Sequence, residues 1–247
     1  MMPTLRAEFR KLLTVRSTYF IVAITLFIVA FFAGFINGFR AEVPALMQPH
    51  VLASASTDAI IFVGLVLAFA GLLLAGHEYR YNTIMYTLTA SNRRYKVLLA
   101  KLVVVTVFAL FASLLVMFFS PLCTILGAHL AGHHIGPQTF DVWVLMWRCL
   151  FCGWGYSMYA FILLIVLRSQ VGAIVTFLLV PLIGENILSA LLKSNTKYLP
   201  FNAVQSVAEP TGLGNHTTSG HAALTVLVYV GVGLIISTVL FIRRDAN

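Results

Sequence analysis

The stretch His77–Lys96, HEYRYNTIMYTLTASNRRYK, separates two long apolar runs of the chain. It is rich in tyrosine and carries several basic residues, whereas the sequence on either side is almost purely apolar. Lysine and arginine next to membrane-crossing segments are retained on the cytoplasmic side. The stretch therefore predicts a cytoplasmic connection between two membrane-spanning helices, and it orients the segments around it.

Composition indicates the same class of protein over the whole chain. Of the 247 residues 60% are hydrophobic and only 10% are charged, and the mean hydropathy is +0.94, far outside the range of soluble domains. A helix needs about 20 apolar residues to cross about 30 Å of hydrocarbon. We therefore predict one all-α membrane domain over 1–247, with six spans at 17–39, 59–76, 102–126, 142–167, 171–192 and 222–242.

The net charge of +8 is distributed along the chain between the spans and does not gather on one face. Of the 16 Lys and Arg residues, only Arg40, Lys193 and Lys197 fall in predicted outer loops, and only Arg148 falls inside a span. The distribution of positive residues indicates which segments lie on the cytoplasmic side of the membrane, and it argues against nucleic acid as a partner. We predict a multi-pass protein of the lipid bilayer with both termini in the cytoplasm.

Two segments outside the spans have features of their own. In 1–16, apolar residues recur at helical spacing against a basic surface, which predicts an amphipathic helix at the inner headgroup layer; a plain positive flank is the alternative. The outer loop 193–221 combines prolines with aromatic and aliphatic residues. Prolines interrupt a helix, so this loop predicts short re-entrant helices before the last span.

Two ionisable residues fall within predicted spans, where a charge is costly. They are Arg148 in the fourth span and Glu185 in the fifth, and residue counts from the outer ends of these spans place both at a similar depth. We predict an intramembrane ion pair that joins the two spans. The alternative is that Glu185 faces the pathway between two protomers while Arg148 extends toward the outer surface.

Small and metal-binding residues give weaker signals. Gly34 and Gly38, four residues apart in the first span, predict close helix packing, either in a dimer or within one protomer. Cys149 and Cys152 share a helix face but lack further ligands, and six of the seven histidines fall in outer segments without a completing carboxylate. We predict no metal site and no catalytic residues.

The order of these elements resembles the ATP-binding-cassette (ABC) type-2 permeases over nearly the whole chain. The resemblance is carried by Arg16-Ser17 before the first span, by Gly76-His77-Glu78-Tyr79-Arg80 and the basic residues up to Lys101 after the second, and by Lys197-Tyr198-Leu199-Pro200-Phe201 before the sixth. It implies that 77–98 forms a coupling helix that docks on a separate ATPase. The residues expected in that contact are Glu78, Tyr79, Arg80, Tyr81, Thr83, Ile84, Tyr86 and Thr87; an interfacial aromatic belt against lipid headgroups is the alternative.

The resemblance also implies the partners. The chain contains no Gly-x-x-x-x-Gly-Lys-Ser/Thr motif, so ATP and Mg are expected on the partner ATPase and no cofactor on this chain. The expected assembly has two ATPase subunits and a second permease protomer, identical or not, in a bacterial plasma membrane. It would export amphipathic or hydrophobic molecules such as drugs or peptides. The alternative is a channel or secondary transporter without an ATPase partner.

Overall fold

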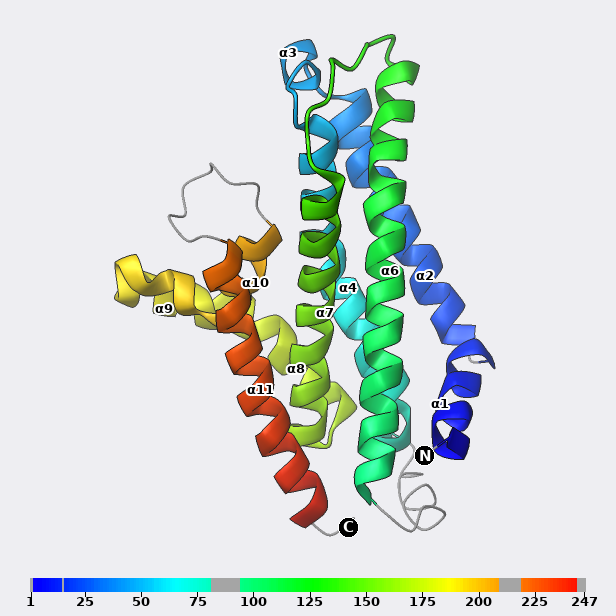
Figure 1. Ribbon diagram of the computed structural model, residues 1–247, viewed down its shortest axis with the longest axis vertical. Helices are drawn as coiled ribbons and strands as arrows, with labels where there is room; N and C mark the ends of the chain where they lie inside the picture. Colours follow the sequence, from blue (N-terminus) through cyan, green and yellow to red (C-terminus); the bar gives the residue numbers. More distant parts are fainter. Residues whose placement is uncertain (1, 15, 81–93, 209–218, 244–247) are drawn as a thin grey trace.

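The computed structural model describes residues 2–14, 16–80, 94–208 and 219–243, and no strand occurs among them. Helices of very different lengths pack side by side into an elongated bundle (Figure 1). This confirms the predicted all-α class. The elements are α1 (Met2–Thr14), α2 (Arg16–Val29), the π-helix η1 (Ala30–Phe39), α3 (Val43–Leu46), α4 (Val51–Arg80), α6 (Arg94–Leu130), α7 (Val142–Leu167), α8 (Gln170–Leu179), the π-helix η2 (Val180–Gly184), α9 (Glu185–Leu192), the 3-10 helix η3 (Lys193–Tyr198), α10 (Pro200–Ala208) and α11 (Ser219–Arg243).

Six helical runs of the described residues are long and apolar enough to cross a membrane, as predicted. Both ends of the chain lie at one end of the bundle, which we call the base, together with the end of α4 and the start of α6 (Figure 1). The opposite end is the far end. The six runs are Thr18–Phe39, Val51–Leu73, Tyr95–Leu130, Val142–Leu167, Gln170–Leu192 and Ser219–Arg243.

The second helix begins at Val51, earlier than the predicted start at Ala59. The hydroxyl-rich stretch before Ala59 resembles a loop in sequence, but its hydroxyl groups bond to backbone carbonyls of the helix itself. Ser54 Oγ donates to the Val51 carbonyl at 3.0 Å, and Thr57 Oγ1 donates to the Ser54 carbonyl at 3.0 Å. Because these polar side chains are satisfied locally, the helix continues through them.

A proline inside α6 is accommodated by a partner from α4. Pro121 has no N–H group, so the carbonyl of Met117, four residues earlier, loses its usual helical donor. The buried Ser56 Oγ donates to this carbonyl at 3.3 Å, and Ser120 Oγ donates back to the Ala55 carbonyl of α4 at 2.7 Å. These two hydrogen bonds join α4 and α6 where the long helix would otherwise have an unpaired carbonyl.

At the far end, two connections are hydrogen-bonded to each other. The Gln138 side chain accepts the Leu52 N–H at 3.1 Å and donates to the Gln48 carbonyl at 3.2 Å. The Gly136 N–H donates to the Leu46 carbonyl at 3.1 Å. The connection between α6 and α7 therefore closes over α3 and the start of α4.

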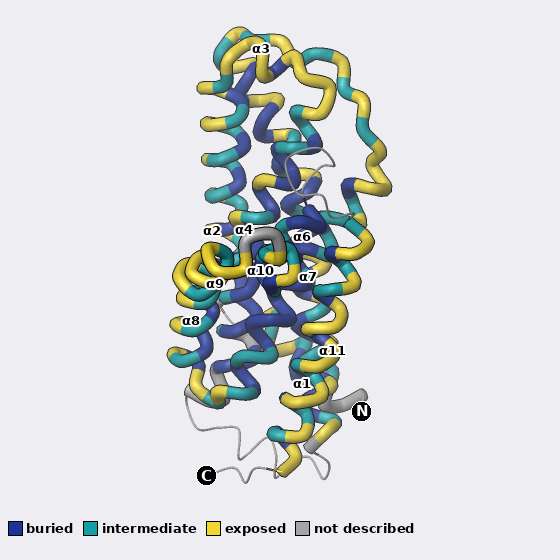
Figure 2. Tube along the Cα trace, turned by 90° about the vertical axis from the view of Figure 1, so that its left-hand side faces the viewer, coloured by how far each residue is buried: buried dark blue, intermediate teal, exposed yellow. Residues whose placement is uncertain are grey.

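The fifth candidate span is bent. Pro181 lies in η2, between α8 and α9, and the chain turns there so that α9 extends sideways from the bundle (Figure 1). In the perpendicular view of Figure 2 the same helix points toward the viewer and is largely exposed. A proline interrupts the helical hydrogen-bond ladder, which explains the change of direction. Only α8 therefore runs along the bundle, and the predicted fifth span is present as a helical run, Gln170–Leu192, with a bend at Pro181.

Candidate functional site

The predicted contact with an ATPase falls on the connection between α4 and α6 at the base. Glu78, Tyr79 and Arg80 form the last turn of α4, but their side chains lie outside the described residues. The rest of the predicted contact lies outside the described residues altogether, and its role stays a prediction; these residues are Tyr81, Thr83, Ile84, Tyr86 and Thr87. The structure does place the two helix ends that flank this connection, Arg80 and Arg94, at the base (Figure 1).

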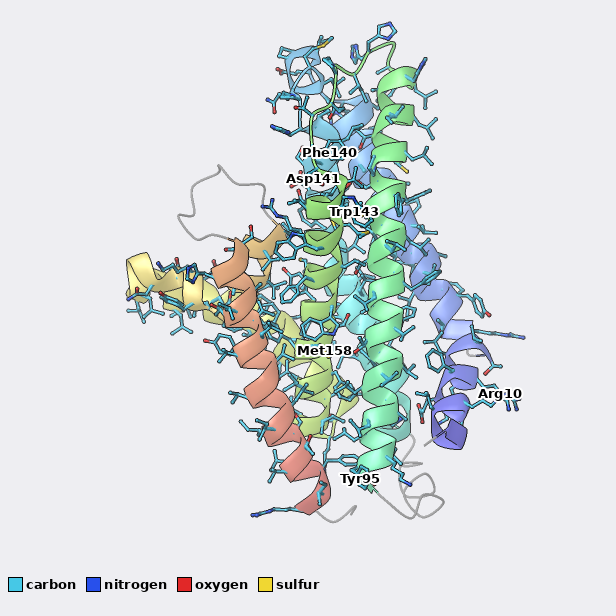
Figure 3. The ribbon with its side chains drawn as sticks, viewed as in Figure 1. Arg10, Tyr95, Phe140, Asp141, Trp143 and Met158 are labelled. Carbon is cyan, nitrogen blue, oxygen red and sulfur yellow. The ribbon has the colours of Figure 1, made fainter. Side chains whose placement is uncertain are left out.

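Beside this connection, α1 packs against α6 through a buried ion pair that sequence analysis missed. The Glu8 carboxylate lies 3.5 Å from the Lys101 ammonium and 2.9 Å from that of Lys11. Glu8 is 5% exposed and Lys101 is 2% exposed. A buried charge is tolerated when it has a partner of opposite sign, so this pair fixes α1 in register with the start of α6. Arg10, by contrast, extends from α1 away from the other helices (Figure 3).

A helix over Met2–Thr14 is therefore present as predicted, and its position at a lipid surface stays a prediction. One feature of the sequence could have indicated that this helix packs against the bundle: Glu8 is an acidic residue among basic neighbours, one turn before Lys11. The partner on α6 lies more than ninety residues further along the chain. Only the tertiary fold brings the two together.

Glu185, which sequence analysis singled out, caps a helix other than its own. Its Oε1 accepts the Phe201 N–H at 2.7 Å, and its Oε2 accepts the Asn202 N–H at 3.0 Å. These are the first free N–H groups of α10, because Pro200 has none and the preceding Leu199 has no side chain that could cap. The carboxylate of α9 thus supplies the cap that the sequence of α10 lacks, and its charge complements the helix dipole.

The body of α10 rests on an aromatic cluster formed by α7 and α8. The ring centroid of Phe201 lies 5.2 Å from that of Phe177, 5.6 Å from that of Tyr159 and 6.0 Å from that of Tyr156. From α11, Tyr229 Oη donates to the Tyr198 carbonyl just before α10 at 3.0 Å. Because α4, α7, α8, α9 and α11 all contact it, α10 joins five helices of the bundle.

The predicted ion pair between Arg148 and Glu185 stays a prediction. The residue counts that placed the two at a similar depth ran along a span that, in the structure, bends at Pro181, four residues before Glu185. Arg148 is half-buried, two turns after Asp141, whose side chain caps α7 by accepting the Trp143 N–H at 2.9 Å. Asp141 and Trp143 mark this upper end of α7 in Figure 3.

Gly34 and Gly38 both pack against α6 of the same chain. A Cβ atom on Gly38 would lie 2.5 Å from the Thr124 carbonyl oxygen, and a Cβ atom on Gly127 would collide with the Gly34 carbonyl oxygen. Thr124 Oγ1 donates to the Ala33 carbonyl of η1 at 3.1 Å across this crossing. The intrachain alternative is therefore what the structure shows for these glycines, whereas a contact between two copies stays a prediction.

The sequence of the chain is similar to that of a known family of membrane proteins. It matches the family model described as "ABC-2 family transporter protein" over residues 4–185. The matched region runs from α1 to the first residue of α9 and so includes the connection between α4 and α6. No curated protein matches the chain.

Proposed function

Since the chain belongs to the ABC-2 transporter family, whose membrane proteins generally work with ATPase subunits, we propose that it is the permease subunit of an exporter driven by a separate ATPase. The observation that carries the proposal is the family match, which covers α1, α4, α6 and the connection between α4 and α6. The absence of any Gly-Lys dipeptide from the sequence supports it, because a phosphate-binding loop of the Walker type requires one.

In this proposal the base faces the cytoplasm. The start of α1 and the end of α11 lie at the base, and so do the basic residues Arg6, Arg10 and Arg243 of these two helices, which supports this orientation. Positive residues are retained on the cytoplasmic face of a bacterial plasma membrane. The ATPase would then reach the connection between α4 and α6 from below, through the residues from Glu78 to Thr87.

Transport would follow from movement of α4 and α6 when two ATPase subunits close on ATP. Both helices leave the connection directly and are joined to each other by the serine hydrogen bonds around Pro121. A second permease protomer, identical or different, would complete the path, and amphipathic or hydrophobic molecules would move outward. ATP and Mg would be bound by the ATPase and not by this chain.

The test is co-purification of the ATPase from its native membrane in mild detergent. The double variant Tyr79→Ala with Tyr86→Ala should lower the ATPase recovered per permease at least about tenfold, because aromatic anchors of an interface typically contribute more than 1 kcal/mol each. The matched control is Tyr198→Ala, a tyrosine 54% exposed and away from the base, which should leave recovery unchanged.

Unchanged recovery in the double variant, with normal membrane insertion, would contradict docking at this connection. Transport by the purified permease in vesicles without any ATPase or nucleotide would instead support a channel or secondary transporter. Mass spectrometry of the same preparation identifies both the ATPase and any co-purifying molecule.

A further inference from the structure

Gln170, the first residue of α8, has a buried carboxamide without a partner. The residue is 5% exposed, and neither Nε2 nor Oε1 has a hydrogen-bond partner among the residues that the structure describes. A glutamine amide offers two donors and an acceptor, and buried polar groups in native proteins are almost always paired. An amide unpaired on both sides calls for an explanation in terms of function.

The surroundings of Gln170 are tightly packed. A Cβ atom on Gly76 of α4 would lie 3.1 Å from Gln170 Cγ and 3.2 Å from Leu164 Cδ1 of α7. A glycine at 76 therefore allows three helices to meet around the amide. This contact lies one turn before Arg80, where α4 leads into the connection that we propose binds the ATPase.

The start of α8 is held to the end of α7 by local hydrogen bonds. The turn between α7 and α8 is short: Arg168 adopts a left-handed conformation with φ 51°, and its N–H donates to the Leu164 carbonyl at 2.9 Å. Ser169 Oγ then caps α8 by accepting the Gly172 N–H at 3.1 Å. The start of α8 is thus fixed to the end of α7. If α4 is displaced, its last turns therefore move relative to Gln170.

We infer that Gln170 is a positioning residue for coupling, one that disfavours the conformation described here relative to the one driven by ATP. Its amide is unpaired in this arrangement and gains a backbone or side-chain partner when the last turns of α4 move past the start of α8. An unsatisfied buried group shifts a two-state equilibrium toward the state that satisfies it. The inference rests on the proposed function, because it requires that α4 is moved by an ATPase.

The experiment compares the wild-type complex with Gln170→Met, which keeps the length of the side chain but removes both polar atoms. Each permease is purified with its ATPase, and hydrogen exchange is measured in the peptides that cover α4 and α8, with and without ATP plus orthovanadate. In the variant, the permease should melt about 2–4 °C higher, because an unpaired buried amide has been removed. The change in hydrogen exchange that ATP plus orthovanadate causes should fall about tenfold, because the conformation driven by ATP no longer gains a hydrogen bond for the residue at position 170.

Thr25→Val is the matched control. Thr25 is 4% exposed, and its hydroxyl also has no partner among the described residues, but it lies in α2, away from the contact between α4 and α8. The control should raise the melting temperature while the nucleotide response stays at the wild-type level. A Gln170→Met complex that melts lower, or that melts higher with an unchanged nucleotide response, overturns the inference. Absence of any ATPase from the wild-type complex contradicts the proposed function instead.

Discussion

The cap that Glu185 provides for α10 makes a quantitative prediction. Glu185→Gln keeps the size of the side chain but replaces one carboxylate oxygen by an NH₂ group, which cannot accept the Phe201 or Asn202 N–H. The variant loses one hydrogen bond to a charged acceptor and places a donor against a donor. A hydrogen bond to a charged group contributes about 1.5–3 kcal/mol, and relief of the buried charge offsets part of that, so we expect a net loss of about 2 kcal/mol.

This loss should be local, because the cap holds only the first turn of α10. About 2 kcal/mol corresponds to about a 30-fold increase in the population of the locally open state. Hydrogen exchange of the peptide covering Pro200–Ala208 should therefore become about 30-fold faster in lipid nanodiscs. Exchange in α6, which contributes no hydrogen bond to this cap, should stay at the wild-type rate.

Ser189→Ala is the control, since this half-buried residue of α9 bonds to the Asn186 carbonyl of its own helix, at 2.9 Å. It should leave exchange in α10 unchanged. If Glu185→Gln also leaves that exchange unchanged, the carboxylate does not hold the helix, and the account of α10 given above is wrong. Equal acceleration in both variants would show that α9 as a whole, and not the cap, stabilises α10.

Two further predictions concern the joints between long helices, and both are read from the melting temperature in detergent. Ser56→Ala removes the donor to the Met117 carbonyl, at a cost of about 1–2 kcal/mol, and should lower the melting temperature by about 2–8 °C. Ser54→Ala is the control and should lower it less, because the Ser54 hydroxyl bonds within α4. Equal effects of the two variants would show that the hydrogen bond to the Met117 carbonyl has no special role. Gly127→Ala should lower the melting temperature by about 2–12 °C, because overpacking against the backbone of η1 costs about 1–3 kcal/mol. Gly231→Ala, which adds a methyl group where nothing lies within 4 Å, should leave it unchanged or raise it, and similar losses in both glycine variants would contradict the close crossing.

Sequence analysis predicted the spans well because a membrane imposes one strong rule. Every backbone polar group in hydrocarbon must be paired within the chain, so apolar runs of sufficient length become helices. The boundaries were less predictable. The hydroxyl-rich start of α4 around Ser56 resembles a loop in sequence, and the hydrogen bonds of its hydroxyl groups within α4 and to α6 show why it remains helical.

Some of the functional residues could be recognised from the sequence, and others only from the structure. Glu185 was recognised because a carboxylate in an apolar run is costly and needs a reason. Its partners were not predictable, since Phe201 and Asn202 contribute backbone N–H groups, which every residue except proline has. Gln170 gave no signal in the sequence, because a glutamine next to a short turn is ordinary until its burial is known.

The sequence by itself determined the class of the protein, the six spans and the family, because hydropathy and charge are properties of single residues summed over short windows. The tertiary structure alone decided which polar groups meet: Glu8 with Lys101, Glu185 with the start of α10, and the carboxamide of Gln170 with nothing among the described residues. Pairing depends on the directions of helices after a bend at Pro181 and on approaches permitted by glycines. Such directions arise from packing over the whole bundle, and no short window of sequence contains them.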